Sequence, residues 1–247
     1  MTKYVLFDTE TTGNQAEDRI IQVGAMVIGA KGDVVVYDEL CSADLPIKIE
    51  AMEVHNITPD IIEGKAPFTA TKFWNDLAEL NSENNYLIAH NIKFDLGMLE
   101  KEGFSNNMKL IDTLRCSKHL FPESDYHRLQ YFRYSLGLYK KEQEEAKKHN
   151  ITIKAHDAIG DVLVMKLFLS ELVKKVKEKF PNINPMVKLE ELTHTPVMLQ
   201  SFKFGKYKGE RIDDIARSDA GYIKWMLKSL ALDEDLKYTL EKVLENV

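Results

Sequence analysis

The first forty residues consist of apolar runs separated by turn-forming residues. β-Prone runs cover residues 4–8, 20–28 and 33–40, and the sequences Thr-Thr-Gly and Gly-Ala-Lys-Gly lie between them. Apolar runs of this length bounded by turn residues are typical of β-strands. This part of the chain therefore predicts a three-stranded meander.

From about residue 47 the pattern changes to helical pieces. A short apolar run at 86–89 precedes a predicted helix at 92–102, and a second apolar run follows at 108–111. A long amphipathic helix is predicted at 157–180, where apolar residues recur at helical spacing. Antiparallel strands followed by β-α-β units imply a mixed sheet with helices on both faces and right-handed crossovers. The predicted fold class is α/β.

A proline-bracketed stretch, Pro181-Asn-Ile-Asn-Pro185, ends the long predicted helix. We take this stretch as the domain boundary. The prediction is a first domain at 1–180, a linker at 181–187, and a small, mostly helical module at 188–247. A length of 247 residues fits one α/β domain with such an appendage.

The composition, 44% hydrophobic and 29% charged, is that of an ordinary globular protein. No apolar run is long enough to cross a membrane, and the N-terminus meets an acid too early for a signal peptide, so we expect a cytoplasmic protein. Cys41 and Cys116 are far apart without metal-site spacing, which argues against zinc and against a disulfide framework. The net charge of −6 does not suggest a nucleic-acid partner, so any basic surface must be local.

Two acids end the first predicted strand. In Phe7-Asp8-Thr9-Glu10 the carboxylates are two residues apart, so a strand places them on one face, where they can share one ion. The pair is weak evidence alone, because a chain rich in acids contains such spacing by chance. Its position at the end of an apolar strand strengthens it, since two buried carboxylates repel each other unless a cation or proton intervenes.

Two further motifs lie at predicted helix starts. Asp95 falls in the first turn of the helix at 92–102, where Asn91 is a plausible N-cap and an acid also complements the helix dipole. His156 and Asp161 flank the start of the long helix, where Asp157 offers a simple N-cap. Capping and dipole effects explain each motif separately, so neither motif is decisive alone.

Together the motifs resemble the DnaQ-like exonucleases of the DEDDh class, which carry D-x-E-T-T-G, H-N-x-x-F-D and H-x-x-x-x-D. Every residue of that pattern is present here in that order, within about residues 3–175. The resemblance implies a ribonuclease-H-like mixed sheet flanked by helices and a 3′-to-5′ exonuclease that releases nucleoside 5′-monophosphates. The catalytic residues it implies are Asp8, Glu10, Asp95, His156 and Asp161.

The four acids predict a metal site. Carboxylate oxygens favour Mg²⁺, with Mn²⁺ as the alternative ion, and two such ions can together drive phosphodiester cleavage. By resemblance to the family, Asp8 would bridge both ions, Glu10 and Asp161 would complete the nucleophile-side site, and Asp95 would hold the second ion. His156, whose ordinary pKa lies near neutrality, would be the general base.

Three residues of the same domain are candidates for substrate contact. The family places the main chain around Thr9 against the terminal sugar, and segments like those around His55 and Asn91 beside the terminal nucleotide. For His55 the alternative is a surface histidine before a turn. For Asn91 the alternative is the capping role already described.

The C-terminal module contains a local basic segment. Residues 202–211 interleave three aromatic residues with four basic residues and one acid. Aromatic rings can stack on bases while lysines meet phosphates, so Lys206 and Lys208 are candidate DNA contacts. A twisted hairpin with a solvated lysine face is the alternative.

The module also carries a second resemblance. The strings at 204–209, 212–216 and 219–227 are similar to the C-terminal module of the bacterial exodeoxyribonuclease X family. This resemblance implies DNA as the substrate and DNA repair or end processing as the role. Tyr222, Trp225 and Met226 fall at helical spacing, which we interpret as a packed helix face.

Several alternatives stay open from the sequence. The expected partner is DNA with a 3′ end, single- or double-stranded, and no membrane or protein partner is indicated. An RNA-directed exoribonuclease or a polymerase proofreading subunit would share the acidic motifs. A catalytically silent nucleic-acid-binding protein is the alternative of another class, and a single structural cation is a third.

Overall fold

The computed structural model of the chain describes residues 1–29, 32–153 and 157–245. The chain divides into two compact units, Met1–Thr193 and His194–Val247. This division lies later than the predicted linker at 181–187. The reason is helix α9 (Pro185–His194), whose Leu189 and Leu192 are buried in the core of the first unit.

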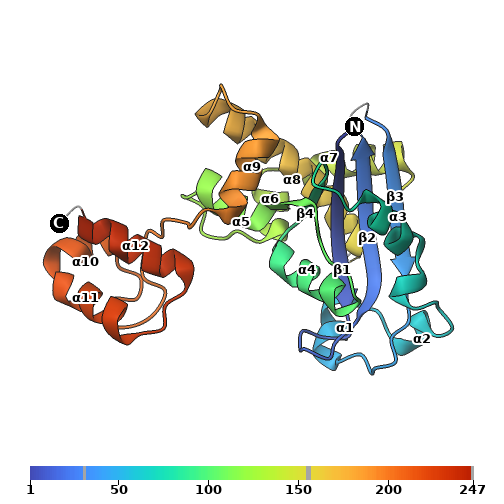
Figure 1. The fold of residues 1–247 in the computed structure, drawn as a ribbon, viewed down its shortest axis with the longest axis horizontal. Coiled ribbons are helices and arrows are strands. Elements are labelled where there is room, and N and C mark those ends of the chain that lie inside the picture. The colour runs from blue at the N-terminus through green and yellow to red at the C-terminus, as the bar shows by residue number, and fades with distance from the viewer. Residues whose placement is uncertain (30–31, 154–156, 246–247) are drawn as a thin grey trace. The chain divides into compact units, whose positions relative to one another are not determined.

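The first unit is built on one five-stranded mixed sheet with the order β3-β2-β1-β4-β5 (Figure 1). Strands β1 (Lys3–Thr11), β2 (Ile20–Gly29) and β3 (Val34–Leu40) form an antiparallel meander. Strands β4 (Tyr86–Ala89) and β5 (Lys109–Asp112) run parallel to β1. The predicted α/β class and the meander are confirmed.

Helices connect and flank the strands. The helices of the first unit before α9 are α1 (Ile49–His55), α2 (Pro59–Ile62), the short 3₁₀ helix η1 (Phe68–Ala70), α3 (Lys72–Leu80), α4 (Ile92–Lys101), α5 (Thr113–Leu120), α6 (Leu129–Ser135), α7 (Tyr139–His149) and α8 (Ala158–Lys179). No helix in the described ranges is long and apolar enough to cross a membrane.

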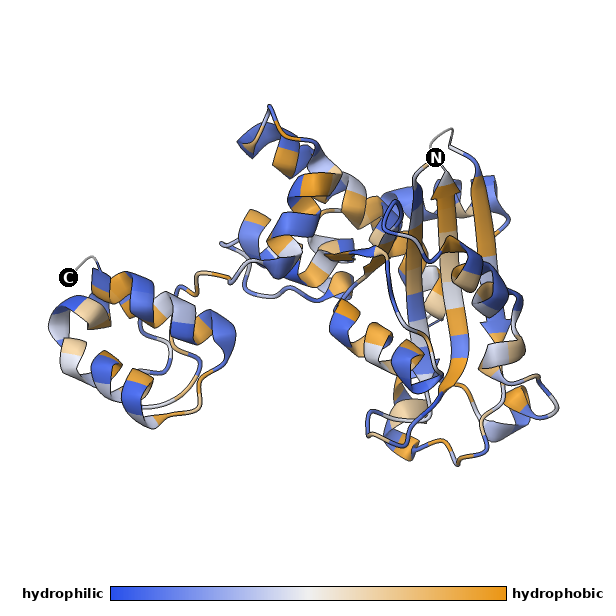
Figure 2. Cartoon of the chain, in the orientation of Figure 1, coloured by the Kyte–Doolittle hydropathy of each residue, from blue (hydrophilic) through white to orange (hydrophobic). Residues whose placement is uncertain are grey.

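The alternation of side chains along β1 builds two cores. Leu6 faces a cluster that includes Phe168 of α8, whereas Val5 and Phe7 face a cluster that includes Phe73 of α3. Helices on both faces explain why β2 is apolar along most of its length, as Figure 2 shows, and why β1 has consecutive apolar residues at Val5, Leu6 and Phe7. The acids that interrupt this pattern near the end of β1 therefore lie next to the hydrophobic core.

A glycine in β2 allows α8 to pack directly on the sheet. Gly24 pairs with Asp8 across the β1–β2 ladder. A Cβ atom at Gly24 would lie 2.3 Å from the carbonyl carbon of Ala158 and from the backbone nitrogen of Ile159. Because Gly24 has no side chain, the first turn of α8 can lie directly against the strand residue that pairs with Asp8.

Gly24→Ala is expected to lower the free energy of unfolding by about 1–3 kcal/mol, because the added methyl group overlaps helix backbone that cannot move independently. Thermal or urea unfolding measures this change. Gly97→Ala is the matched control, since a Cβ atom there meets nothing within 4 Å and α4 should gain helix propensity. Equal stability of the two variants would contradict the close packing of α8 on β2.

The second unit has a small core of its own. Its helices are α10 (Ile212–Ser218), α11 (Ala220–Ser229) and α12 (Glu234–Glu245). Phe202, Ile223 and Leu240 are fully or almost fully buried in a cluster formed within this unit. An isolated bridge between Ser201 and Arg211 closes the segment that precedes α10.

Candidate active site

The end of β1 extends beyond its neighbour β4. The parallel pairing of these strands covers only Tyr4 to Leu6, so the later residues of β1 have β2 on one side alone. Asp8 and Glu10 follow Leu6 at intervals of two and therefore share its face of the sheet, the face covered by α8. Both carboxylates are partly buried.

The acids lie close enough to perturb one another. Burial raises the pKa of Asp8 well above its ordinary value, and the charges of Asp95, Glu10 and Asp161 raise it further. Burial, together with Asp161, Asp95 and Asp157, raises the pKa of Glu10 to about 8. Four acids from β1, α4 and α8 thus form one electrostatic cluster, and the family resemblance had implied that these acids come together.

Asp95 is held by the strand that carries the first two acids. Its Oδ1 accepts hydrogen bonds from the backbone nitrogen of Thr9, at 3.1 Å, and from the Thr9 hydroxyl, at 2.8 Å. Burial raises the pKa of Asp95 to about 7, although the two bonds from Thr9 lower it. Thr9, predicted to contact substrate, therefore also positions Asp95.

Asp161 accepts one bond of a chain of hydrogen bonds that links α8, α6 and α7. Gln130 of α6 donates to Asp161 Oδ1 at 2.6 Å, and Arg133 donates to Gln130 Oε1 at 3.1 Å. Arg133 is in turn paired by two hydrogen bonds, of 2.6 and 2.7 Å, with the buried carboxylate of Glu142 on α7. The arginine fixes the oxygen side of the Gln130 amide, so the amide nitrogen is directed at Asp161.

Asp157 differs from its predicted role. It occupies the N-cap position of α8, but its side chain makes no capping bond. Asp157 Oδ1 accepts from Gln22 of β2 at 2.6 Å, and its buried Oδ2 has no hydrogen-bond partner among the described residues. His156, the predicted general base, lies outside the described residues.

The four acids are suited to hard cations by their chemistry, although their side chains are not arranged in a coordination geometry. Among the described residues, no group of three or more His, Cys, Asp or Glu side chains is arranged to hold a metal ion as it stands. Carboxylates that raise one another's pKa values repel when ionised, and a cation removes that repulsion. All four donors are carboxylates, the ligand type preferred by Mg²⁺ and Mn²⁺.

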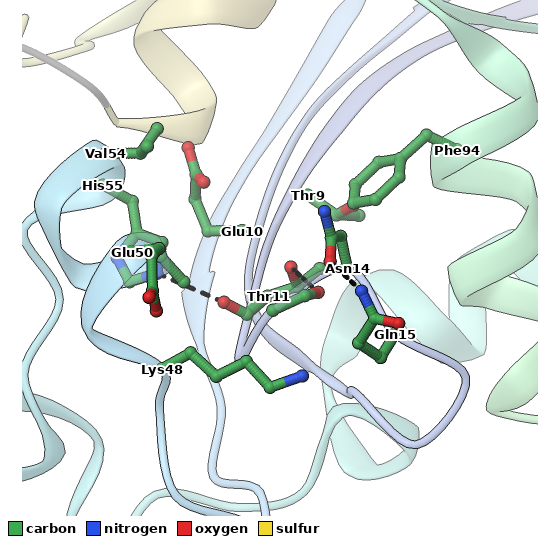
Figure 3. Close-up of a pocket in the computed structure, with 12 residues that line it drawn as sticks. Thr9, Glu10, Thr11, Asn14, Gln15, Lys48, Glu50, Val54, His55 and Phe94 are labelled. Atoms are coloured by element: carbon green, nitrogen blue, oxygen red, sulfur yellow. Dashed lines mark hydrogen bonds between the residues drawn. The ribbon is translucent and has the colours of Figure 1, made fainter.

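A pocket of about 600 Å³ opens beside Glu10. Its walls come from the end of β1, the following loop, α1 and α4 (Figure 3). The lining residues are Thr9, Glu10, Thr11, Gly13, Asn14, Gln15, Lys48, Glu50, Ala51, Val54, His55 and Phe94. In Figure 3, Glu10 lies between the apolar side chains of Val54 and Phe94. A volume of this size suits a small organic ligand or one nucleotide.

His55 lines this pocket, but both of its ring nitrogens are occupied. Nδ1 accepts from the backbone nitrogen of Ile57 at 2.9 Å, so Nε2 carries the proton and donates to the carbonyl oxygen of Thr11 at 3.2 Å. The residue is only 5% exposed, and burial lowers the pKa of its imidazole. His55 therefore ties the end of α1 to β1, and the alternative of a surface histidine before a turn is wrong.

Asn91 also differs from its predicted capping role. The residue has a left-handed backbone with φ of 79°, and its side chain makes no capping bond at the start of α4. Its backbone nitrogen donates to Asp112 Oδ1 at 3.0 Å. Asn91 is exposed and is not one of the residues that line the pocket.

The sequence motifs did not point to Lys48, which lines the pocket. Its ammonium group lies 2.6 Å from Asp18, a buried acid that also accepts from the Thr12 hydroxyl at 2.8 Å. This contact joins the chain before α1 to the loop after β1. No pattern in the sequence marks this contact, because Asp18 is one polar residue of a polar loop and its partner is thirty residues away.

The predicted lysine contacts lie in the second unit. Both lysines are exposed. The ammonium group of Lys206 lies 3.2 Å from Asp219 and 4.5 Å from the centre of the Tyr207 ring. The interpretation of the α11 aromatics is partly wrong. Met226 is fully buried, but Trp225 is 50% exposed, because helical spacing does not reveal which rings the core can accommodate.

Two family models match the chain. Residues 5–169 match the model described as Exonuclease, and residues 202–231 match the one described as Exodeoxyribonuclease X-like C-terminal. The first match covers more than half of the chain, so the chain belongs to this exonuclease family. The class of enzyme and the C-terminal resemblance predicted from the motifs are confirmed.

Particular relatives refine this assignment. The chain is 26% identical to Exodeoxyribonuclease 10 of Escherichia coli (strain K12), over 98% of both chains. It is 32% identical over 145 residues to DNA polymerase III subunit epsilon of Treponema pallidum, a match that covers 55% of this chain and 65% of the relative.

Solved structures share the fold. Exonuclease X in complex with 5′ overhanging duplex DNA is similar with a TM-score of 0.51 and 18% identity, over 76% of this chain and 99% of that chain. Exonuclease I of E. coli in complex with a dA16 oligonucleotide is similar with a TM-score of 0.50 and 21% identity, over 77% of this chain and 42% of that chain. The predicted ribonuclease-H-like fold is thereby confirmed.

Proposed function

We propose that this exonuclease hydrolyses DNA from the 3′ end and releases nucleoside 5′-monophosphates, in DNA repair or end processing. The observation that carries the proposal is the cluster of four carboxylates beside a nucleotide-sized pocket at the end of β1. The full-length similarity to an exodeoxyribonuclease supports DNA as the substrate.

Each residue of the site has a proposed role in catalysis. Asp8, Glu10, Asp95 and Asp161 would hold two Mg²⁺ ions, with Mn²⁺ as a substitute. When bound, these cations supply an activated water and stabilise charge on the phosphate and on the leaving oxygen. His156 accepts the proton of the attacking water at a ring nitrogen. Replacing His156 should therefore lower the rate of turnover more than it lowers the affinity for the metal.

The pocket receives the 3′-terminal nucleotide. Val54 and Phe94 lie on either side of Glu10 and offer apolar surface to a base (Figure 3). Thr9 and His55 support this arrangement through their bonds to Asp95 and to the Thr11 carbonyl. Asn91, at the start of α4, contacts the substrate outside the pocket in this proposal.

A substrate panel tests the proposal. Purified protein is incubated with matched single-stranded DNA, duplex DNA and RNA in Mg²⁺, in Mn²⁺ and in chelator. Cleavage of DNA that requires the cation is the expected result. Preference for RNA would move the chain to an exoribonuclease, and binding without cleavage under every condition would make it a silent nucleic-acid-binding protein.

The hydrogen bonds behind Asp161 give a separate prediction. Gln130→Leu removes the donor to Asp161 while keeping a side chain of similar size. We expect the concentration of Mn²⁺ needed for half-saturation to rise about tenfold or more, the effect typical of losing a residue that orients a metal ligand. Mn²⁺ binding followed by electron paramagnetic resonance measures this without turnover.

Gln143→Leu is the matched control, because Gln143 is exposed on α7 next to Glu142. Its Mn²⁺ affinity should equal that of the wild type. Arg133→Met should weaken Mn²⁺ binding in the same direction as Gln130→Leu, since Gln130 then loses the partner that orients its amide. Unchanged Mn²⁺ affinity in both the Gln130 and Arg133 variants would contradict this prediction. The hydrogen bonds would then only hold the helices together.

A further inference from the structure

An exposed aromatic face lies on α11 in the second unit. Tyr222, Trp225 and Lys228 follow one another at intervals of three and therefore lie on one side of the helix. Trp225 is 50% exposed, although an indole ring is costly to leave in water. Its neighbours one turn away, Gly221 and Ser229, are exposed and carry little apolar surface.

The rings are held in a fixed row. The ring centre of Tyr222 lies 5.0 Å from that of Tyr207 and 5.7 Å from that of Trp225. The Tyr207 hydroxyl donates to Asp219 at 2.7 Å. Gly205 has φ of 79° and a Cβ atom there would lie 2.6 Å from the Tyr222 hydroxyl, so loop 203–208 can approach α11 only through a glycine. Trp225 thus ends an ordered row whose other rings are packed.

The loop and the helix that carry this row are rich in lysine. The loop and the helix together carry five lysines and, within residues 202–209 and 220–229, no acid. The lysines are Lys203, Lys206, Lys208, Lys224 and Lys228. The nearby acid Asp219 is engaged by Tyr207 and Lys206. The acids of α10 instead lie beside arginines, with Asp213 3.4 Å from Arg211.

We propose that loop 203–208 and the exposed side of α11, here called the Trp225 face, bind single-stranded DNA. A base stacks on Trp225, and the lysines meet the flanking phosphates. Aromatic stacking combined with lysines is the usual way in which proteins bind single strands without reading their sequence. The large exposed side chains of this face are the aromatic rings of Trp225 and Phe204, at 50% and 45% exposure, and they stand among lysines, glycine and serine. Isolated rings among positive charges suit a charged polymer better than a hydrophobic protein partner, which would need a continuous apolar patch.

The inference rests on the proposed function for the identity of the polymer. If the polymer is DNA, the roles assigned to Trp225 and Lys208 change. Trp225 becomes a contact residue although its spacing suggested core packing. Lys206 is engaged by Asp219 and by the tyrosine rings, so Lys208 is the stronger phosphate contact of the two.

The two tryptophans of the chain allow a direct test. Trp74 lies in the first unit between Phe68 and Phe104, and Trp225 is the other. Trp74→Phe leaves Trp225 as the one indole reporter, and Trp225→Phe leaves Trp74. Each variant is titrated with an oligothymidylate in chelator, so that no hydrolysis occurs. The expected result is quenched emission in Trp74→Phe and unchanged emission in Trp225→Phe.

Affinity is measured in parallel by fluorescence anisotropy of the labelled oligothymidylate. Trp225→Ala should weaken binding about fivefold or more, the effect of losing one stacked base, and Trp225→Phe should restore most of it. Lys208→Ala should flatten the salt dependence of binding, because one phosphate contact is lost. Lys237→Ala on α12 is the control and should leave the slope unchanged.

The outcomes separate this inference from the proposed function. If DNA binds and is hydrolysed while Trp225 emission and the affinity of Trp225→Ala are unchanged, the face does not bind single-stranded DNA and the inference is overturned. The exonuclease proposal would then stand on the first unit alone. If the wild type neither binds nor hydrolyses DNA, both proposals are overturned together.

Discussion

Asp8→Asn is expected to abolish hydrolysis, by a factor on the order of 10³ or more, and at the same time to raise the melting temperature of the metal-free protein. Activity falls because Asp8 is the acid whose pKa all three other members of the cluster raise, which places it at the centre of the proposed metal site. Stability rises because the neutral amide is not repelled by Asp95, Glu10 and Asp161. Single-turnover hydrolysis and calorimetry measure the two effects.

Asp125→Asn is the matched control for this variant, because Asp125 is exposed and far along the chain from the cluster. It should keep both the activity and the melting temperature of the wild type. Opposite changes in activity and stability are the signature of a functional site, since a residue that only maintains the fold loses both together. Retained hydrolysis in Asp8→Asn would contradict the metal assignment.

The metal-free protein is expected to become less stable as the pH rises from about 5 to about 8. The folded protein raises the pKa of Glu10 from 4.5 to about 8 and that of Asp95 from 3.8 to about 7. Between the ordinary and the raised values, the folded state holds protons that the unfolded chain has released, so the free energy of unfolding falls with increasing pH. Each kcal/mol lost lowers the melting temperature by roughly 2–4 °C.

Glu10→Gln should reduce this pH dependence, because one of the shifted groups no longer titrates. Glu53→Gln, at an exposed position of α1, should leave it unchanged. Saturating Mg²⁺ should remove most of the fall in wild type, since a bound cation stabilises the ionised carboxylates and the folded state. The account fails here if wild type and Glu10→Gln in chelator show the same dependence of melting temperature on pH.

The sheet was predictable because its signals are local. The apolar runs that predicted strands at 4–8, 20–28 and 86–89 correspond to β1, β2 and β4 within three residues at each end. The acidic motifs were predictable because each falls at the end of a strand or the start of a helix. That these acids lie close together in space was implied by the family resemblance and could not be predicted from their spacing in the sequence.

Other features depend on contacts between distant segments. Gly24 matters only because α8, more than a hundred residues later, approaches it. Gln130 and Arg133 look like ordinary residues of an amphipathic helix until Asp161 and Glu142 are placed beside them. Pro185 suggested an ending because proline stops helices, yet proline is equally suited to the first turn, where it begins α9.

The most direct test of the central claim follows the shortening of a DNA strand labelled at its 5′ end, in Mg²⁺, for wild type and Asp8→Asn. The account predicts a ladder that shortens one nucleotide at a time from the 3′ end, release of nucleoside 5′-monophosphates, and loss of both in chelator and in the variant. Immediate release of the labelled 5′ nucleotide, or a ladder that persists in Asp8→Asn, would contradict it.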